Sequence, residues 1–220
     1  SISDAVEGKH YKLLSNTVTI KAGECSANVQ VQGIYDNIDI DDYLTVGLRL
    51  VIPKEEQWSL YGIDSKVILQ KACPFDINSF TGYCKVTSTF FDDYMQNVTM
   101  RLIKTSVNPE KENSVILHDL YYNGHDIVLD FDRDNLLEPL VSMEEQVCGT
   151  TAEAFGTIYG DGNLLMYQPT MYTSYYSTCE KFVLQYVTLY VNGVGTVGTY
   201  VNILEWISDA EAEKLKEQGY

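Results

Sequence analysis

The segment Asp130-Phe131-Asp132-Arg133-Asp134-Asn135 is the sharpest candidate for a metal site in the sequence. Alternate carboxylates that leave a strand can surround a hard cation with oxygen ligands, as the first half of a calcium-binding loop does. Asn135 stands where such loops usually carry glycine, and asparagine tolerates the left-handed backbone. Val141 stands where the closing glutamate is expected. The candidate calcium ligands are Asp130, Asp132 and Asp134, and a solvated acidic strand end is the alternative.

A second candidate site is the tyrosine-rich segment 167–176, which reads YQPTMYTSYY. Tyrosine rings can stack on sugars, and the neighbouring threonine and serine hydroxyls can bond sugar hydroxyls. Barrel mouths are favoured places for such ligands. The alternative is a loop whose aromatic rings pack on their own barrel. The candidate ligand-binding tyrosines are Tyr167, Tyr172, Tyr175 and Tyr176.

Histidine is the third residue type with possible chemistry, at His10, His118 and His125. The hairpin register predicted below separates His118 from His125 by about 13 Å along the strands, which is too far for one metal ion. The same register places His118 on the apolar inner face. There it is either a hydrogen-bonded core residue or a polar anchor that lines a ligand cavity.

Local motifs for catalysis are missing from the sequence. It contains no GxSxG elbow, no HExxH and no glycine-rich phosphate loop, and its five cysteines form no CxxC pair. Paired carboxylates of a glycoside hydrolase meet only in space, so that activity is the least favoured alternative. We therefore expect a protein that is not an enzyme and that uses no nucleotide cofactor.

The charge balance narrows the choice of partners. The net charge of −16 at pH 7 repels nucleic acid and anionic membrane surfaces. No stretch approaches the roughly 20 apolar residues that span a bilayer, although a lipid anchor or export signal removed upstream is compatible with the sequence. The odd cysteine count implies at least one thiol outside any intramolecular disulfide, and the spacing does not reveal the pairing.

The elements that would position these residues are predicted to be antiparallel strands. Proline in Lys71-Ala72-Cys73-Pro74 breaks the preceding strand and sets a domain boundary, giving domains 1–72 and 73–220. In the second domain so many strands with tight turns favour a closed barrel. The expected strands are 81–90, 94–105, 114–122, 125–132, 140–148, 153–159, 163–172, 181–191 and 195–206. A capping box at Ser208–Glu211 predicts a short C-terminal helix over 211–218.

Two Asn-Gly pairs, Asn123-Gly124 and Asn192-Gly193, lie between apolar strands and favour two-residue type I′ hairpins. For the first pair this predicts a register in which four residue pairs face each other. These pairs are Tyr122 with His125, Leu120 with Ile127, His118 with Leu129, and Ile116 with Phe131.

The first domain shows alternating apolar positions over 18–31, around the turn Lys21-Ala22-Gly23-Glu24, and again over Tyr43–Ile52. The strings AVEGKHY at 5–11, VTIKAGE at 18–24 and DIDDYLTVGL at 39–48 resemble the later half of a Calx-beta-type immunoglobulin-like sandwich. The family's first strands have no counterpart here. The resemblance implies a small, partial sandwich.

Together the two domains resemble Bacteroidetes-type exported or surface lipoproteins of unknown function, in which a sandwich precedes a lipocalin-like barrel. The resemblance implies an all-β fold with an antiparallel up-and-down barrel. It also implies a secreted or cell-envelope location. We expect a binding protein for a glycan or small molecule, in or at the mouth of the barrel. A structural or adhesion protein that pairs strand edges with another chain is the alternative.

Overall fold

The computed structural model describes residues 3–51, 55, 64–135 and 138–220. The chain divides into two compact units, Ser1–Ala72 and Cys73–Tyr220. Each unit is built mainly from antiparallel strands. The units are described separately below.

The first unit contains two small antiparallel sheets. β1 (Tyr11–Leu13) pairs with β2 (Val31–Gly33), and β3 (Tyr43–Arg49) pairs with β4 (Asp64–Gln70). A short 3-10 helix, η1 (Tyr35–Asn37), follows β2. Among the described residues of the first unit, the buried apolar ones are Ala5, Ile38 and Val46. The small core suits a module with few strands.

Only part of the alternation predicted in this unit forms strands. The turn at Lys21–Glu24 is present, since the Glu24 amide donates to the Lys21 carbonyl at 2.9 Å. The expected strands on both sides of it are wrong, because residues 14–30 form no strand and Val18, Ile20 and Val29 are exposed. Alternation yields a strand only where one face is covered. The strand expected over Tyr43–Ile52 ends at Arg49, and Ile52 lies outside the described residues.

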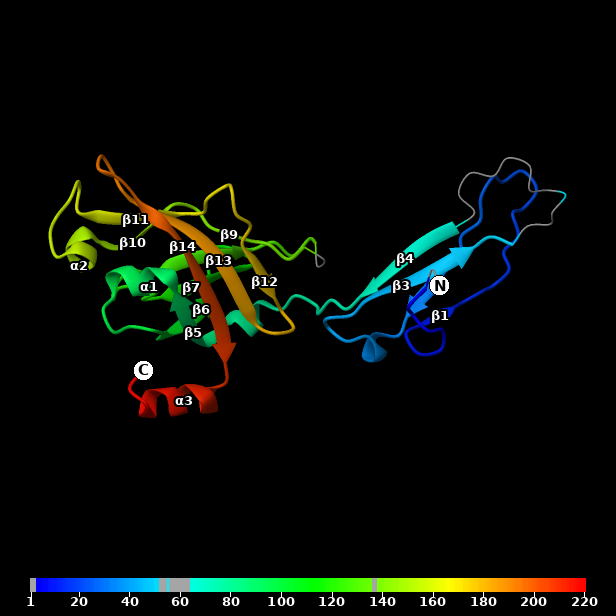
Figure 1. Cartoon of the computed structure of the whole chain (residues 1–220), viewed down its shortest axis with the longest axis horizontal. Coiled ribbons are helices and arrows are strands. Elements are labelled where there is room, and N and C mark those ends of the chain that lie inside the picture. Colours follow the sequence, from blue (N-terminus) through cyan, green and yellow to red (C-terminus); the bar gives the residue numbers. More distant parts are fainter. Residues whose placement is uncertain (1–2, 52–54, 56–63, 136–137) are drawn as a thin grey trace. The chain divides into compact units, whose positions relative to one another are not determined.

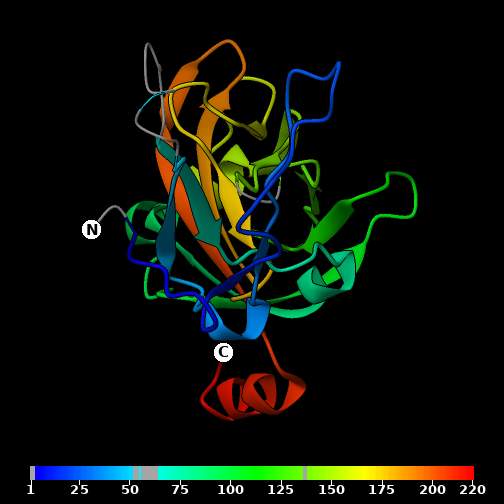
Figure 2. The same ribbon diagram turned by 90° about the vertical axis from the view of Figure 1, so that its right-hand side faces the viewer.

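The second unit is one large curled antiparallel sheet with the shape of a half-barrel (Figure 1 and Figure 2). The strand order is β10-β11-β13-β14-β5-β6-β7-β8-β9, and β12 also pairs with β13. The bounds are β5 Gly82–Ser88, β6 Arg101–Val107, β7 Ser114–His118, β8 Ile127–Phe131, β9 Val141–Ser142, β10 Gln146–Thr150, β11 Asn163–Tyr167, β12 Tyr175–Ser177, β13 Phe182–Val191 and β14 Gly195–Ile207. The predicted all-β, antiparallel architecture is confirmed.

Hydrogen bonds join the two edges of this sheet. The Tyr176 amide donates to the Pro139 carbonyl at 2.9 Å, and the Val141 amide donates to the Ser174 carbonyl at 3.1 Å. Farther along, the side-chain amide of Gln146 bonds both backbone groups of Val128, at 2.7 and 2.8 Å. A side chain here takes the place of a neighbouring strand, so these contacts link the two sides of the half-barrel.

Side chains fill the space that the sheet encloses. Phe80 lies at the centre of one aromatic cluster, with its ring centroid 4.5 Å from that of Phe131 and 5.1 Å from that of Trp206. A second cluster surrounds Phe90, which packs on Tyr121 and Tyr200. Aliphatic side chains such as Leu117, Leu129 and Leu189 are fully buried between them. The interior is therefore a packed core.

A buried chain of polar side chains crosses this core. The Tyr121 hydroxyl donates to Asn202 Oδ1 at 2.8 Å, and Asn202 Nδ2 donates to Gln185 Oε1 at 3.1 Å. Gln185 Nε2 then contacts Met143 Sδ at 3.1 Å. All four side chains are buried. Each side-chain amide in the chain makes a hydrogen bond with the next polar group. Buried polar groups that are hydrogen-bonded in this way cost little folding free energy.

In the described part of this unit, three short α-helices and the 3-10 helix η3 (Ile77–Phe80) accompany the sheet, and two of the α-helices lie where strands were predicted. α1 (Thr89–Tyr94) begins at Ser88, whose hydroxyl accepts from the Phe90 amide, so the strand expected over 81–90 ends early. α2 (Thr151–Phe155) begins with a capping box between Thr150 and Glu153, so the strand expected over 153–159 is wrong. Capping side chains satisfy the free amides of the first turn and favour helix over strand.

The strand expected over 94–105 also begins later, as β6 at Arg101. Asn97 has a φ of 64°, and the Val98 amide donates to the Met95 carbonyl at 3.1 Å. This turn separates α1 from β6. An asparagine in the left-handed conformation ends an extended segment. The pattern of apolar residues does not reveal this change of backbone conformation.

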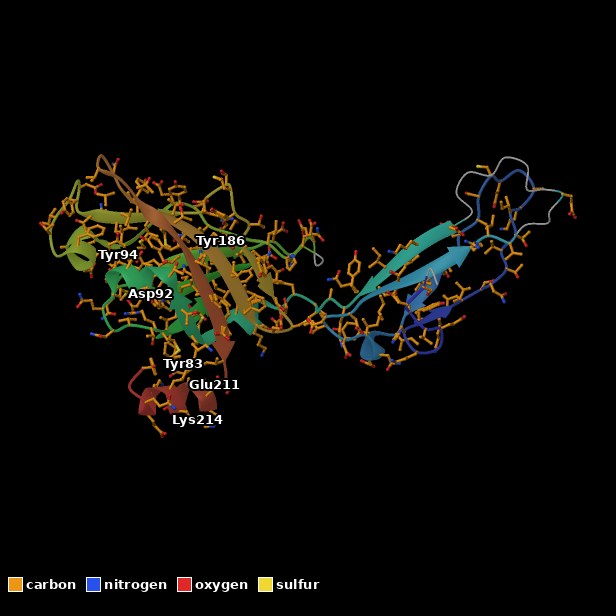
Figure 3. All side chains as sticks on the ribbon, in the orientation of Figure 1. Tyr83, Asp92, Tyr94, Tyr186, Glu211 and Lys214 are labelled. Carbon is orange, nitrogen blue, oxygen red and sulfur yellow. A yellow bond between two sulfur atoms is a disulfide. The ribbon has the colours of Figure 1, made fainter. Side chains whose placement is uncertain are left out.

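α3 (Asp209–Glu217) is the predicted C-terminal helix, and Ser208 caps it by accepting from the Glu211 amide. Tyr83 of β5 faces this helix in Figure 3. Its hydroxyl accepts a hydrogen bond from Lys216, and the ammonium of Lys104 lies 3.4 Å from the centroid of its ring. The hydrogen bond from Lys216, followed by that from Lys104, lowers the pKa of Tyr83. Tyr83 thus anchors the helix to the sheet.

Both Asn-Gly pairs form turns, but neither has the predicted type I′ geometry. Gly124 and Gly193 have φ values of 84° and 73°, whereas the left-handed non-glycine residues in the described part of the chain are Asn97, Asn113, Asp119 and Lys181. Type I′ needs a positive φ at the asparagine as well. The loop between β13 and β14 has three residues, 192–194, and the loop between β7 and β8 has eight, 119–126.

The longer loop shifts the register of β7 and β8. Leu117 faces Ile127, and Val115 faces Leu129. The prediction paired Leu120 with Ile127, so the predicted register is wrong by three residues. An odd shift moves every side chain of β7 to the opposite face. His118, predicted on the inner face, therefore lies on the outer face, where its side chain is 37% exposed.

One disulfide, Cys73–Cys179, links the start of the second unit to the turn before β13. Cys25 is exposed, and Cys84 and Cys148 are buried thiols. Burial raises the pKa of the Cys148 thiol to about 12, so it remains protonated and behaves as a small apolar side chain. Among the described residues, no helix has the length and apolar character needed to cross a bilayer.

Candidate functional site

The tyrosine-rich segment and strand β13 together form an aromatic surface on the outside of the sheet. Three ring pairs lie along β13, each joining a β13 residue to the segment 167–175. The pairs are Tyr190 with Tyr167 at 5.7 Å, Tyr186 with Tyr172 at 4.9 Å, and Phe182 with Tyr175 at 6.0 Å between centroids. We call these six residues the tyrosine face. Figure 3 labels Tyr186, which lies on β13.

Strand geometry explains the spacing of the tyrosine face. Phe182, Tyr186 and Tyr190 lie four residues apart, so all three project from the same side of β13. At a rise of about 3.4 Å per residue, successive pairs are about 13 Å apart. The alternate residues Val183, Gln185 and Val187 point into the buried core. The sheet thus sets both the direction and the separation of the rings.

The loop that carries Tyr172 is held against β13 by Ser174. The Ser174 hydroxyl is buried and accepts from the Tyr186 amide at 2.9 Å. The rings of Tyr172 and Tyr186 lie within 18° of parallel, with Tyr172 almost half exposed. This pair therefore offers a flat, fixed aromatic surface to solvent.

Polar groups lie among the rings. Thr188 lies between Tyr186 and Tyr190 along β13. Its hydroxyl shares a hydrogen bond of 2.8 Å with the hydroxyl of Thr199 on β14. A hydrogen bond with Glu145, together with burial, raises the pKa of Tyr190. Gln168 Oε1 is buried and has no hydrogen-bond partner among the described residues. Aromatic surface interleaved with hydroxyl and amide groups is the composition expected of a sugar-binding surface.

A hollow of about 500 Å³ borders the Tyr175 end of the tyrosine face. It is lined by Glu138, Pro139, Leu140, Thr173 and Tyr175. Its volume falls within the usual range for small-ligand sites.

The structure separates the predicted ligand-binding residues into two groups. Tyr167, Tyr172 and Tyr175 lie on the tyrosine face, with exposed fractions of 37–47%. Tyr176 instead points into the core, where its hydroxyl donates to the Asp132 carbonyl at 2.9 Å, and burial raises its pKa to about 12. His118 is far along the sheet order, on β7. The sequence prediction missed Tyr186 and Tyr190, although alternation over 182–190 already placed them on one face.

Two of the three candidate calcium ligands, Asp130 and Asp132, have carboxylates that bond other groups of the chain. Asp130 accepts from Lys111 Nζ at 2.8 Å, and Asp132 Oδ1 accepts from the Asp134 amide at 2.9 Å. In the described ranges, no group of three or more histidine, cysteine or acidic side chains could hold a metal ion. The arrangement is that of an acidic strand end with local hydrogen bonds.

A separate surface cleft of about 410 Å³ lies between β8 and β10. We call it the acidic cleft, because its lining includes Glu110, Asp130, Glu144 and Glu145, beside Lys111 and Val128. Lys111 bonds Asp130, which raises the pKa of Lys111. Asp130 Oδ1 is buried with no hydrogen-bond partner in the described part of the chain. Since Glu145 also bonds Tyr190, the acidic cleft adjoins the tyrosine face.

Comparisons with known proteins place most of this architecture in one family. A family model described as a domain of unknown function (DUF4984) matches residues 60–218, which include every strand of the second unit. No curated protein and no solved structure matches the chain.

Proposed function

The chain belongs to the DUF4984 family of domains of unknown function, and from this premise we propose that its second unit binds a neutral glycan on the tyrosine face. The observation that carries the proposal is the row of three ring pairs along β13, each made of one exposed ring and one half-buried ring. Side chains fill the barrel interior, so the outer face replaces the barrel cavity as the binding surface.

The geometry favours an extended ligand over a compact one. Ring pairs about 13 Å apart match a chain of several sugar rings better than a single small molecule. The flat Tyr172–Tyr186 pair suits stacking on the face of a sugar, and nearby hydroxyls can bond its hydroxyl groups. Rigid aromatic side chains lose little entropy on binding, which favours affinity.

The charge distribution favours a neutral ligand. The chain carries a net charge of −16, and Glu138 and Glu145 lie at opposite ends of the tyrosine face. Like charges across a binding surface cost free energy. Sulfated or sialylated glycans would meet this repulsion, whereas uncharged sugars would not.

Tyr186→Ala tests the proposal. An array of neutral oligosaccharides, followed by calorimetric titration with the best one, should give binding to the native protein. We expect the variant to bind about tenfold or more weakly, because one aromatic contact contributes about 0.5–1.5 kcal/mol beyond area burial. Tyr43→Ala is the matched control, since Tyr43 is an exposed tyrosine on β3 of the other unit. Equal losses in both variants, or no neutral sugar bound at all, would refute the proposal.

We infer a secreted or cell-envelope location. The Cys73–Cys179 disulfide is compatible with an oxidising compartment, where such bonds form and persist. The resemblance of the sequence to exported lipoproteins supports the same location. A glycan-binding surface would then face the ligands outside the cell.

A second candidate function is pairing of strand β4 with a strand of another chain. Among the described residues, β4 has β3 as its only strand partner, and Ile68 and Tyr43 are exposed on the same face of this pair. A free strand edge with apolar side chains is a template for another strand.

Sedimentation of Ile68→Lys tests this candidate. If β4 joins two chains, the native protein should show a concentration-dependent dimer that the variant weakens at least tenfold, because the lysine adds a charge to the paired surface. Ile158→Lys is the matched control, since Ile158 is exposed in a loop of the second unit. A native protein that stays monomeric at every concentration and in the presence of candidate partner chains would eliminate this function.

A further inference from the structure

Three polar side chains, on the outer face of β6 and β7 and in the last residue of the loop before β8, are joined in series. Ser106 Oγ lies 2.8 Å from His118 Nε2, and His118 Nδ1 lies 2.8 Å from Asp126 Oδ2. This is the connectivity of a serine, histidine and aspartate acyl-transfer triad, in which the hydroxyl and the carboxylate bond opposite nitrogens of one ring. The triad is recognised by geometry and not by the order of residues in the chain.

The chemistry of the partners fixes the direction of each hydrogen bond. An ionised Asp126 can only accept, so His118 Nδ1 carries the proton of that bond. In a neutral imidazole Nε2 then has a free lone pair, and the Ser106 hydroxyl must donate to it. The histidine is thereby held in the tautomer that can remove a proton from Ser106.

The fold holds the carboxylate in place. Asp126 Oδ1 accepts from the Asp119 amide at 3.3 Å, while Oδ2 bonds the histidine. Asp119 has a φ of 58°, a conformation that places its amide toward Asp126, and its own carboxylate accepts from the Gly124 amide. The eight-residue loop that displaced the predicted register thus orients the third member of the series.

We propose that Ser106, His118 and Asp126 form an acyl-transfer site that hydrolyses carboxylic esters. Ser106 Oγ attacks the carbonyl carbon and its proton passes to His118 Nε2. The bond from carbon to the alcohol oxygen then breaks, and the departing alcohol takes the proton from His118. Water attacks the acyl-serine, gives one proton to His118 and releases the acid, and the proton returns to Ser106. Asp126 stays ionised and stabilises the imidazolium.

The acidic cleft indicates the class of substrate. Ser106 faces Ile116, and Ile116 faces Val128 of the cleft lining, so about two strand spacings, or about 10 Å, separate the serine from the cleft. The carboxylates of the cleft repel anions. The ester should therefore be neutral or carry a cationic group. Ser106 is half-buried and His118 partly exposed, so a substrate can approach from solvent.

A neutral alkyl fluorophosphonate is the probe for this site, because an activated serine displaces its fluoride and remains covalently labelled. We expect intact-protein mass spectrometry to show one adduct, located at Ser106 by peptide mapping. Ser106→Ala should abolish it. Ser142→Ala, an exposed serine of β9, should leave it unchanged.

His118→Gln distinguishes the proposal from a purely structural hydrogen bond. A general base contributes about 10²–10⁴-fold to such reactions, so labelling of Ser106 should slow by at least about 100-fold while the fold is retained. Hydrolysis of p-nitrophenyl acetate should fall in the same variants. An unlabelled Ser106 in the native protein, or labelling at the same rate without the histidine, would overturn the proposal. Neither result depends on the tyrosine face.

Discussion

A protein in which Cys73 and Cys179 are both replaced by alanine should lose about 4–5 kcal/mol of unfolding free energy in its second unit. The disulfide joins residues 106 apart, so it restricts most of the unfolded chain of that unit. Closing a loop of about 100 residues lowers the entropy of the unfolded state by an amount worth about 4.7 kcal/mol at 25 °C. Without the bond, unfolding becomes correspondingly more favourable.

Urea denaturation followed by tryptophan fluorescence measures this loss. Trp206 lies in the core of the second unit, and a Trp58→Phe background leaves it as the single tryptophan. The variant should also show a larger dependence of free energy on urea, because an unconstrained unfolded chain exposes more surface. Cys25→Ala is the control, since that thiol is free and exposed. A loss below about 1 kcal/mol would mean that the bond does not restrict the unfolded state as argued.

Asn202→Leu should lower the unfolding free energy of the same unit by about 2–5 kcal/mol. Asn202 is the second of the four residues in the buried polar chain, and its removal breaks the hydrogen bonds that it makes with the Tyr121 hydroxyl and the Gln185 carbonyl. Each buried polar group left without a hydrogen bond costs about 1–3 kcal/mol. Burial raises the pKa of Tyr121, so its hydroxyl stays protonated and remains a hydrogen-bond donor.

The double variant Tyr121→Phe with Asn202→Leu provides the test of this reasoning. The double variant also lacks the Tyr121 hydroxyl. Its loss of unfolding free energy should therefore be smaller, by about 1 kcal/mol or more, than the sum of the losses in the two single variants. The same urea measurement at Trp206 reports all three proteins. Strict additivity would show that the hydrogen bond between the two side chains contributes nothing to stability.

Side-chain alternation was sufficient to predict the antiparallel sheet and most strands of the second unit, and the capping box at Ser208–Glu211 was sufficient to predict the C-terminal helix. It was insufficient for the faces of β7. That prediction rested on a two-residue turn at Asn123-Gly124, whereas the chain reverses over eight residues from a left-handed Asp119. A register that is wrong by an odd number exchanges inner and outer faces, so His118 was assigned to the core.

The candidate sites were predictable to different degrees for the same reason. The composition of segment 167–176 was enough to single out its tyrosines. Whether each ring faces the core or solvent depends on the pairing with β13, which leaves Tyr175 exposed and Tyr176 buried. The series Ser106, His118 and Asp126 was not predictable, because local motifs cannot reveal residues that meet through the register of separate strands. The expectation that the chain has no catalytic centre rested on such motifs and stays untested.

The two-residue period of β13 has a consequence for how this molecule can change. Val183, Gln185 and Val187 support the core, while Phe182, Tyr186 and Tyr190 meet solvent from the same strand. Substitutions at Phe182, Tyr186 and Tyr190 can therefore alter the outer surface with little effect on interior packing, and the reverse holds for Val183, Gln185 and Val187. A strand of this kind lets the outer aromatic surface vary one residue at a time while the core stays the same.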